Sequence, residues 1–196
     1  MNGKFLVVGT LAAAIALFVW QFISNGVLPW HEATMHAWEG PANDAVVQTI
    51  RANAPENGVY VSDQGVLAAV ALRPDLSDRM QPMGPMMIKQ FVVDLVVAFL
   101  LAVVLLRSGP MMPSRAAVTF AIAGLAAGAV TELSNWIWYG FDFAFSVVNV
   151  IELAVSWFVV GFVLTIVQRR LARMPATTGV RAQGGVEMGS ESTVRR

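Results

Sequence analysis

Residues 131–157 read TELSNWIWYGFDFAFSVVNVIELAVSW and form a turn between two long apolar segments. Glu132 lies in the segment before the turn, and Glu152 lies in the segment after it. An ionised carboxylate in the middle of a bilayer costs about 3 kcal/mol on insertion scales, so such residues face a bundle interior or a wet cavity. We therefore expect Glu132 and Glu152 to mark the inside of the protein.

The composition of the chain is that of a helical membrane protein. Only 13% of its 196 residues are charged, whereas soluble domains average about 25%. The apolar residues fall in runs of roughly 18 to 25, the length that a helix needs to cross a bilayer. Four spans are predicted, at 5–28, 89–106, 116–138 and 144–167. A cleaved signal peptide is the alternative for the first, but its long apolar run without a cleavage site favours an uncleaved helix.

A soluble-looking segment and a polar tail complete the predicted organisation. In residues 31–88, Asn43 or Asp44 is expected to cap a short helix, and two apolar runs around Ser62-Asp-Gln-Gly65 predict a β-hairpin. The fold class is thus an all-α membrane protein, a four-helix transmembrane bundle with a small extracytoplasmic αβ cap. The expected parts are 1–30 (first span), 31–88 (cap), 89–170 (spans two to four) and 171–196 (disordered tail).

The distribution of Lys and Arg predicts the orientation. With four spans, both termini lie on one side, which carries nine of the 13 basic residues. The positive-inside rule places that side, and both termini, in the cytoplasm.

Polar residues within the spans predict a layer in the outer half of the bundle. At 1.5 Å per residue, Asp94, Glu132, Glu152 and Gln21 lie about 8 to 14 Å below the outer ends of their spans. Each comes from a different helix and lies on its small or polar stripe. Three clustered carboxylates need a cation, a proton or a bound ligand to balance their charge. The layer is either a proton-binding or ligand-binding site or simply what holds the helices together. The full candidate set is Asp94, Glu132, Glu152, Gln21, Asn135, Asn149 and His31.

A metal site is a second, weaker hypothesis. The chain has no cysteine, so thiolate ligands and disulfides are excluded. Soft thioethers select Cu(I), and several methionines precede the second span. The candidate copper ligands are His31, His36, Met80, Met83 and Met86. No other cofactor is predicted.

Short motifs carry a resemblance to a known group. The chain resembles small, uncharacterised bacterial inner-membrane proteins in Pro29-Trp30-His31 after the first span, Gly58-Val-Tyr60 in the outer loop and Asn135-Trp136 near the end of the third span. The resemblance covers most of the chain except the tail. It implies the bacterial inner membrane and four-span topology, and no activity.

The sequence thus predicts a non-enzymatic accessory or structural membrane protein without catalytic residues. The alternatives are a small proton- or cation-coupled transporter or ligand-binding membrane protein, and copper handling outside the cytoplasm. The lipid bilayer is the expected partner, a membrane protein or a second copy of the chain is left open, and nucleic acid is not expected.

Overall fold

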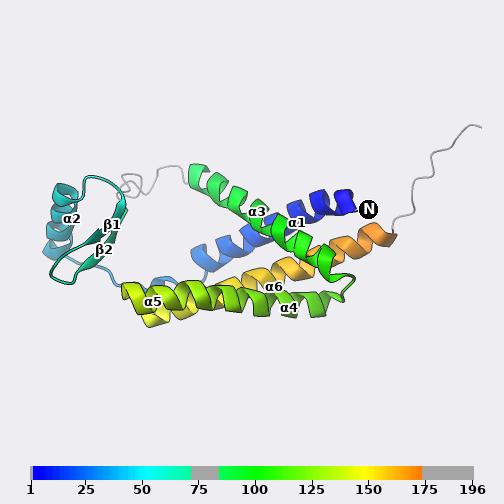
Figure 1. Ribbon diagram of the computed structural model, residues 1–196. Coiled ribbons are helices and arrows are strands. Elements are labelled where there is room, and N and C mark those ends of the chain that lie inside the picture. The colour runs from blue at the N-terminus through cyan, green and yellow to red at the C-terminus, as the bar shows by residue number, and fades with distance from the viewer. Residues whose placement is uncertain (1, 72–83, 174–196) are drawn as a thin grey trace, which may run out of the picture.

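The computed structural model describes residues 2–71 and 84–173 and is mostly helical (Figure 1). Its long apolar helices are α1 (Asn2–Gly26), α3 (Gly84–Ser108), α4 (Pro113–Gly128) and α6 (Phe143–Arg173). The helix α4 continues through a π-helical turn, η3 (Ala129–Leu133), into α5 (Ser134–Tyr139). Within these described residues, four helical segments, with α4, η3 and α5 counted as one, are long and apolar enough to cross a membrane. The predicted spans are confirmed to that extent.

The helix boundaries differ from the predicted ones for local reasons. The helix α3 begins at Gly84, five residues before the expected position, with Pro85 in its first turn, where its fixed φ suits a helix and its missing N–H costs nothing. The helix α6 continues to Arg173, beyond the expected boundary at 170, because Arg is a good helix former and favourable at a helix C-terminus. The remainder of the expected tail, 174–196, lies outside the described residues.

The long helices pack in the order α3, α1, α6 and α4, and this row is only partly closed by contacts between α3 and α6. Extended contacts join α3 to α1, α1 to α6, and α6 to α4, and weaker ones join α3 to α6. In the described parts of the chain, α3 and α4 have no extended contact, and Figure 1 shows them diverging from the loop that joins them. A closed bundle around one axis, as expected from the sequence, is therefore not what the helices form. They leave one side open toward the end at which α5 lies, called here the α5 end.

Glycines allow α4 and α6 to pack closely. A Cβ atom on Gly124 would lie 2.7 Å from the Leu153 carbonyl oxygen, and one on Gly128 would lie 3.0 Å from the Val150 Cα. From α6, a Cβ on Gly161 would lie 2.8 Å from the Ala116 carbonyl oxygen. Gly124 and Gly128 thus form a seam of small residues in contact with α6, as is common between membrane helices.

The apolar core lies between the cavity described below and the loop that joins α3 to α4. Its largest buried members, Phe5, Leu101, Leu105, Phe120 and Leu164, come from all four long helices. These side chains fill the interior at this end of the molecule.

The segment between α1 and α3 contains the predicted helix and hairpin. Helix α2 (Pro41–Asn53) is followed by the antiparallel strands β1 (Gly58–Val61) and β2 (Leu67–Val70), with Val61 opposite Leu67. The predicted cap by Asn43 or Asp44 is wrong: the N-cap residue is Gly40, and no side chain caps the helix. These elements make no extended contact with the long helices and lie beyond the α5 end (Figure 1).

Candidate functional site

A cavity of about 540 Å³ lies at the α5 end, on the open side of the helix row. It is lined by α1, the first turns of α3, the π-helical turn η3 and the first half of α6. Its residues are Phe18, Gln21, Phe22, Asn25, Met86, Met87, Gln90, Glu132, Asn149, Glu152, Leu153 and Ser156. The volume is within the range of small-molecule sites, about 300 to 1,000 Å³. Polar groups and large apolar side chains share its lining.

The chain leaving α1 folds back so that His31 is buried beside the cavity. The carbonyl oxygen of His31 accepts hydrogen bonds from the Thr34 backbone N–H at 3.1 Å and from its hydroxyl at 2.8 Å. The Trp30 indole donates to the Ser24 carbonyl oxygen at 3.0 Å and lies edge-on to the His31 ring. These contacts place the imidazole, 5% exposed, against α6. The motif Pro29-Trp30-His31 therefore positions a buried imidazole beside the cavity.

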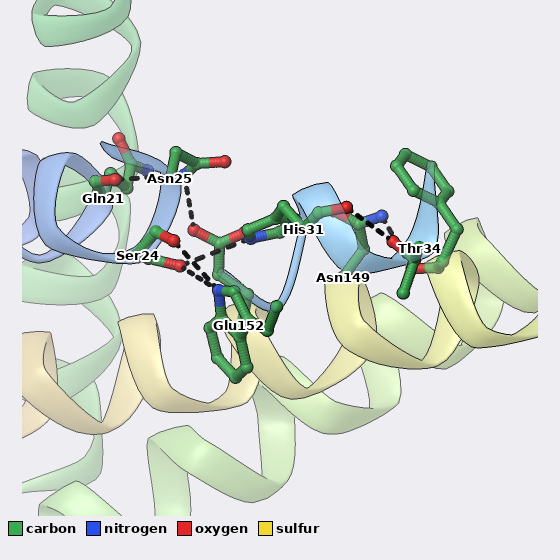
Figure 2. A network of polar contacts seen from close by, with 9 residues as sticks. Gln21, Ser24, Asn25, His31, Thr34, Asn149 and Glu152 are labelled. Atoms are coloured by element: carbon green, nitrogen blue, oxygen red, sulfur yellow. Dashed lines mark hydrogen bonds and ion pairs between the residues drawn. The ribbon is translucent and has the colours of Figure 1, made fainter. Parts of the chain in front are cut away.

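Glu152 is the centre of the first polar network (Figure 2). Its Oε2 lies 2.9 Å from His31 Nε2, and its Oε1 accepts a hydrogen bond from Asn25 Nδ2, also at 2.9 Å. The Ser24 hydroxyl is 3.4 Å from the same imidazole nitrogen. The contact is an ion pair when the imidazole is protonated and a hydrogen bond when the neutral ring carries its proton on Nε2. In both of these forms each carboxylate oxygen has a partner from the α1 side. The network fastens α6 to the end of α1.

Asp94 is the centre of a second network, between α1 and α3. It is 1% exposed, and Gln90 Nε2 donates to its Oδ1 at 3.0 Å. With the Gln21 amide oriented so that its nitrogen faces the carboxylate, that nitrogen lies 3.2 Å from each Asp94 oxygen. Both glutamines also line the cavity, so Asp94 lies behind its wall.

Glu132 differs from the other two carboxylates because the protein leaves it unengaged. It is half-buried in η3 and lines the cavity, yet none of the described residues bonds to its side chain. Ser156, 2% exposed, also lines the cavity, and its hydroxyl has no hydrogen bond within the described ranges 2–71 and 84–173. Single π-helical turns are rare and occur often at functional sites. The cavity thus contains a carboxylate and a hydroxyl group that are free to bind a ligand, called here the guest.

The structure brings together most of the predicted polar layer. Gln21, Glu132, Asn149 and Glu152 line the cavity, with Asp94 and His31 directly behind them. Asn135 is the exception: it lies in α5, one turn beyond Glu132, and is not part of the lining.

The predicted copper ligands are not all within the described residues. Met80 and Met83 lie outside them, while Met86 lines the cavity. His31 is buried against Glu152, whereas His36 is exposed beyond the short 3-10 turn η1 (Glu32–Thr34). In the described part of the chain, no group of three or more His, Cys, Asp or Glu residues could hold a metal ion.

Several residues of the site were not among the sequence candidates. Ser24 and Asn25 complete the Glu152 network, and Gln90 completes that of Asp94. Their spacing contained a signal, because Gln21 and Asn25 are one helical turn apart, as are Gln90 and Asp94. The apolar lining, Phe18, Phe22 and Leu153, had no such signal, since these residues resemble lipid-facing ones.

The arrangement suits binding better than bond-breaking chemistry. It has carboxylates, amides and a histidine, but Glu152 and His31 already satisfy each other. No family model, no curated protein and no solved structure matches this chain.

Proposed function

We propose that this chain is a multi-pass protein of a bacterial inner membrane, crossing it four times with both termini in the cytoplasm. The excess of Lys and Arg on the terminal side supports this orientation. The α5 end, the cavity and the segment with α2 and the hairpin then lie toward the outer face. The resemblance carried by Pro29-Trp30-His31, Gly58-Val-Tyr60 and Asn135-Trp136 is the ground for assigning the membrane.

In this membrane the protein acts as a non-enzymatic accessory protein that binds an amphiphilic small molecule in the outer half of the bilayer. One observation carries this proposal: the cavity combines polar groups with apolar walls on the open side of the helix row. Sites for small molecules have this composition, mostly apolar with a few placed polar groups. The opening between α3 and the α4–α6 pair gives a guest access from the lipid phase.

Binding fits the interior better than conduction does. Between the cavity and the loop joining α3 to α4, the interior is filled by the apolar core that includes Leu101, Leu105 and Leu164. An ion or proton moving past these side chains would meet mostly apolar groups, and the buried Thr165 hydroxyl among them already donates to the Gly161 carbonyl oxygen. We therefore propose that the cavity is a binding site that is closed on its inner side and is not part of a path for ions or protons across the membrane.

Cysteine accessibility tests for a wet cavity, because the chain has no native cysteine. Leu153→Cys introduces a thiol into the cavity, and Ile151→Cys introduces one on the exposed outer face of α6, two residues away. Methanethiosulfonates react with the thiolate, which needs water. In vesicles, an uncharged hydrophilic reagent is expected to modify Leu153→Cys at least about tenfold faster than Ile151→Cys. The thiolate of Ile151→Cys would have to form in hydrocarbon, where a charge is costly. Equal rates for the two variants would rule out a hydrated cavity.

A further inference from the structure

We propose that the ligand is a protonated amphiphilic amine, with its ammonium group on the Glu132 carboxylate and its apolar body extending between α3 and α6. This inference rests on the proposed binding function and adds the chemical class of the ligand.

The charges around the cavity select for a cation. Of the three carboxylates, Asp94 and Glu152 are engaged by neighbouring side chains, whereas Glu132 is engaged by none of the described ones. Lys and Arg are absent from the residues that line the cavity. The histidine at its edge is already in contact with Glu152 at 2.9 Å. A half-buried carboxylate without a partner is stabilised by an ionic hydrogen-bond donor, and an anionic guest would meet repulsion instead.

The free hydrogen-bonding groups include acceptors that a donor on the ligand can use. Asn149 Nδ2 donates to the Phe145 carbonyl oxygen at 2.9 Å, which leaves the Asn149 amide oxygen as the available acceptor. The Ser156 hydroxyl, nearly fully buried, has no hydrogen bond within the described residues. Asn149 and Ser156 lie two turns apart on α6, about 10 Å along the helix, so a single ammonium group on Glu132 can reach at most one of them. A primary ammonium group can donate to the Glu132 carboxylate and to the acceptor within its reach, whereas a quaternary ammonium has no N–H to donate.

The apolar walls fit the rest of the molecule. Phe18 and Phe22 of α1, Met87 of α3 and Leu153 of α6 line the same cavity. Aromatic faces attract a cation, which strengthens the preference near the ammonium group. Phe22 is also 57% exposed, so the wall continues onto the surface that we place against lipid. An alkyl or aryl chain can then leave the cavity sideways between α3 and α6 without contacting water.

Protection of the Leu153→Cys thiol tests this proposal. The protein is placed in phosphatidylcholine vesicles and treated with the uncharged thiol reagent in the presence of dodecylammonium or dodecyl sulfate. Dodecylammonium is expected to slow modification about tenfold, the factor that corresponds to the free energy of one hydrogen bond to a charged group. Dodecyl sulfate is expected to have little effect. Equal protection by the two amphiphiles would overturn the inference.

The variant Glu132→Gln, made in the Leu153→Cys background, identifies the carboxylate. It keeps the size and hydrogen bonding of the side chain but removes the charge, so protection by dodecylammonium should be lost while the thiol still reacts. Glu39→Gln, at an exposed position outside the long helices, is the matched control and should keep protection. Persisting protection in Glu132→Gln would contradict the assignment. A thiol as unreactive as Ile151→Cys would instead refute the cavity itself, so the two failures can be told apart.

A further arm distinguishes the two natural sources of such an amine. Phosphatidylethanolamine carries a primary ammonium group in the membrane, and free amphiphilic amines carry one in solution. Slowing of the reaction by phosphatidylethanolamine vesicles, dependent on Glu132, assigns the lipid headgroup. Slowing by dodecylammonium alone, also dependent on Glu132, assigns a free amine.

Discussion

At the residue scale, the three carboxylates have the same chemistry but differ in the side chains that bond to them. Asp94 is held by side chains of its own helix α3 and of α1, and Glu152 by side chains at the end of α1 and directly after it. Each carboxylate thus fastens α1 to another helix. Glu132 lines the same cavity and contributes no such bond among the described residues. Removing Glu152 leaves a buried histidine without its partner, whereas removing Glu132 leaves nothing unpaired. Stability and binding should therefore respond to different acids.

Replacing Glu152 by Ala is expected to lower the free energy of unfolding by about 3 kcal/mol, because a buried, charged partner is lost. Glu132→Ala should change it by about 0.5 kcal/mol or less, as for a residue without structural contacts. Thermal unfolding in detergent, compared between the two variants, measures the difference. A double variant with His31→Ala should cost less than the sum of the single changes, because the two residues contact each other. Equal loss in both single variants would make Glu132 a structural residue.

At the element scale, glycines determine how closely α4 and α6 pack, and η3 determines where Glu132 lies. The glycines of α4 bring its backbone within van der Waals distance of α6. Directly after them, the chain makes the π-helical turn, and Glu132 faces the cavity from within it. Close packing and the placement of the free acid are thus consecutive features of one helix.

Gly124→Ala should destabilise the protein by about 1 to 3 kcal/mol, because the new methyl group would overlap the Leu153 carbonyl oxygen and α4 would have to move. The gain in helix propensity, about 1 kcal/mol, does not offset a backbone clash at 2.7 Å. Gly3→Ala, where nothing lies within 4 Å, is the control and should be neutral or slightly stabilising. The melting temperatures of the two variants give the comparison. A stabilised Gly124→Ala protein would mean that the helices are not this close.

At the scale of the whole molecule, packing of the helices against one another buries little of their apolar surface. In each candidate span, 28–33% of the most hydrophobic window is buried inside the structure. Large side chains such as Val7, Ile15, Ile122 and Phe158 are exposed along the outer faces. A surface of this kind needs lipid to cover it, and the same incomplete packing leaves α3 apart from α4. The opening proposed for ligand entry thus follows from the number and order of helix contacts.

The proposed topology predicts which loops are accessible from outside the cell. Gln64→Cys, in the turn between β1 and β2, should react with a membrane-impermeant thiol reagent in intact cells. Ser108→Cys, at the opposite ends of the helices, should react only after permeabilisation. Both positions are exposed, so a difference reports sidedness rather than burial. The reverse pattern would invert the orientation and place the cavity near the cytoplasm.

The sequence by itself determined the helices and the hairpin. Apolar runs of sufficient length predict spans whatever their neighbours are, because a backbone in lipid must satisfy its own hydrogen bonds. Gly65, at positive φ in the hairpin turn, shows the same local control. The sequence also predicted that Gln21, Asp94, Glu132 and Glu152 would lie near one another, since each is on the polar or small stripe of its helix.

Only the tertiary structure decided which of these groups are paired and where the helices separate. Asn25 reaches Glu152 across 127 positions in the chain, and such a contact has no local pattern. The same holds for the gap between α3 and α4, which depends on contacts of both helices with other partners. Secondary structure in a membrane is set by short-range backbone hydrogen bonding, whereas a cavity is what remains after all side chains have packed. Its existence, and the free carboxylate within it, depend on the whole arrangement at once.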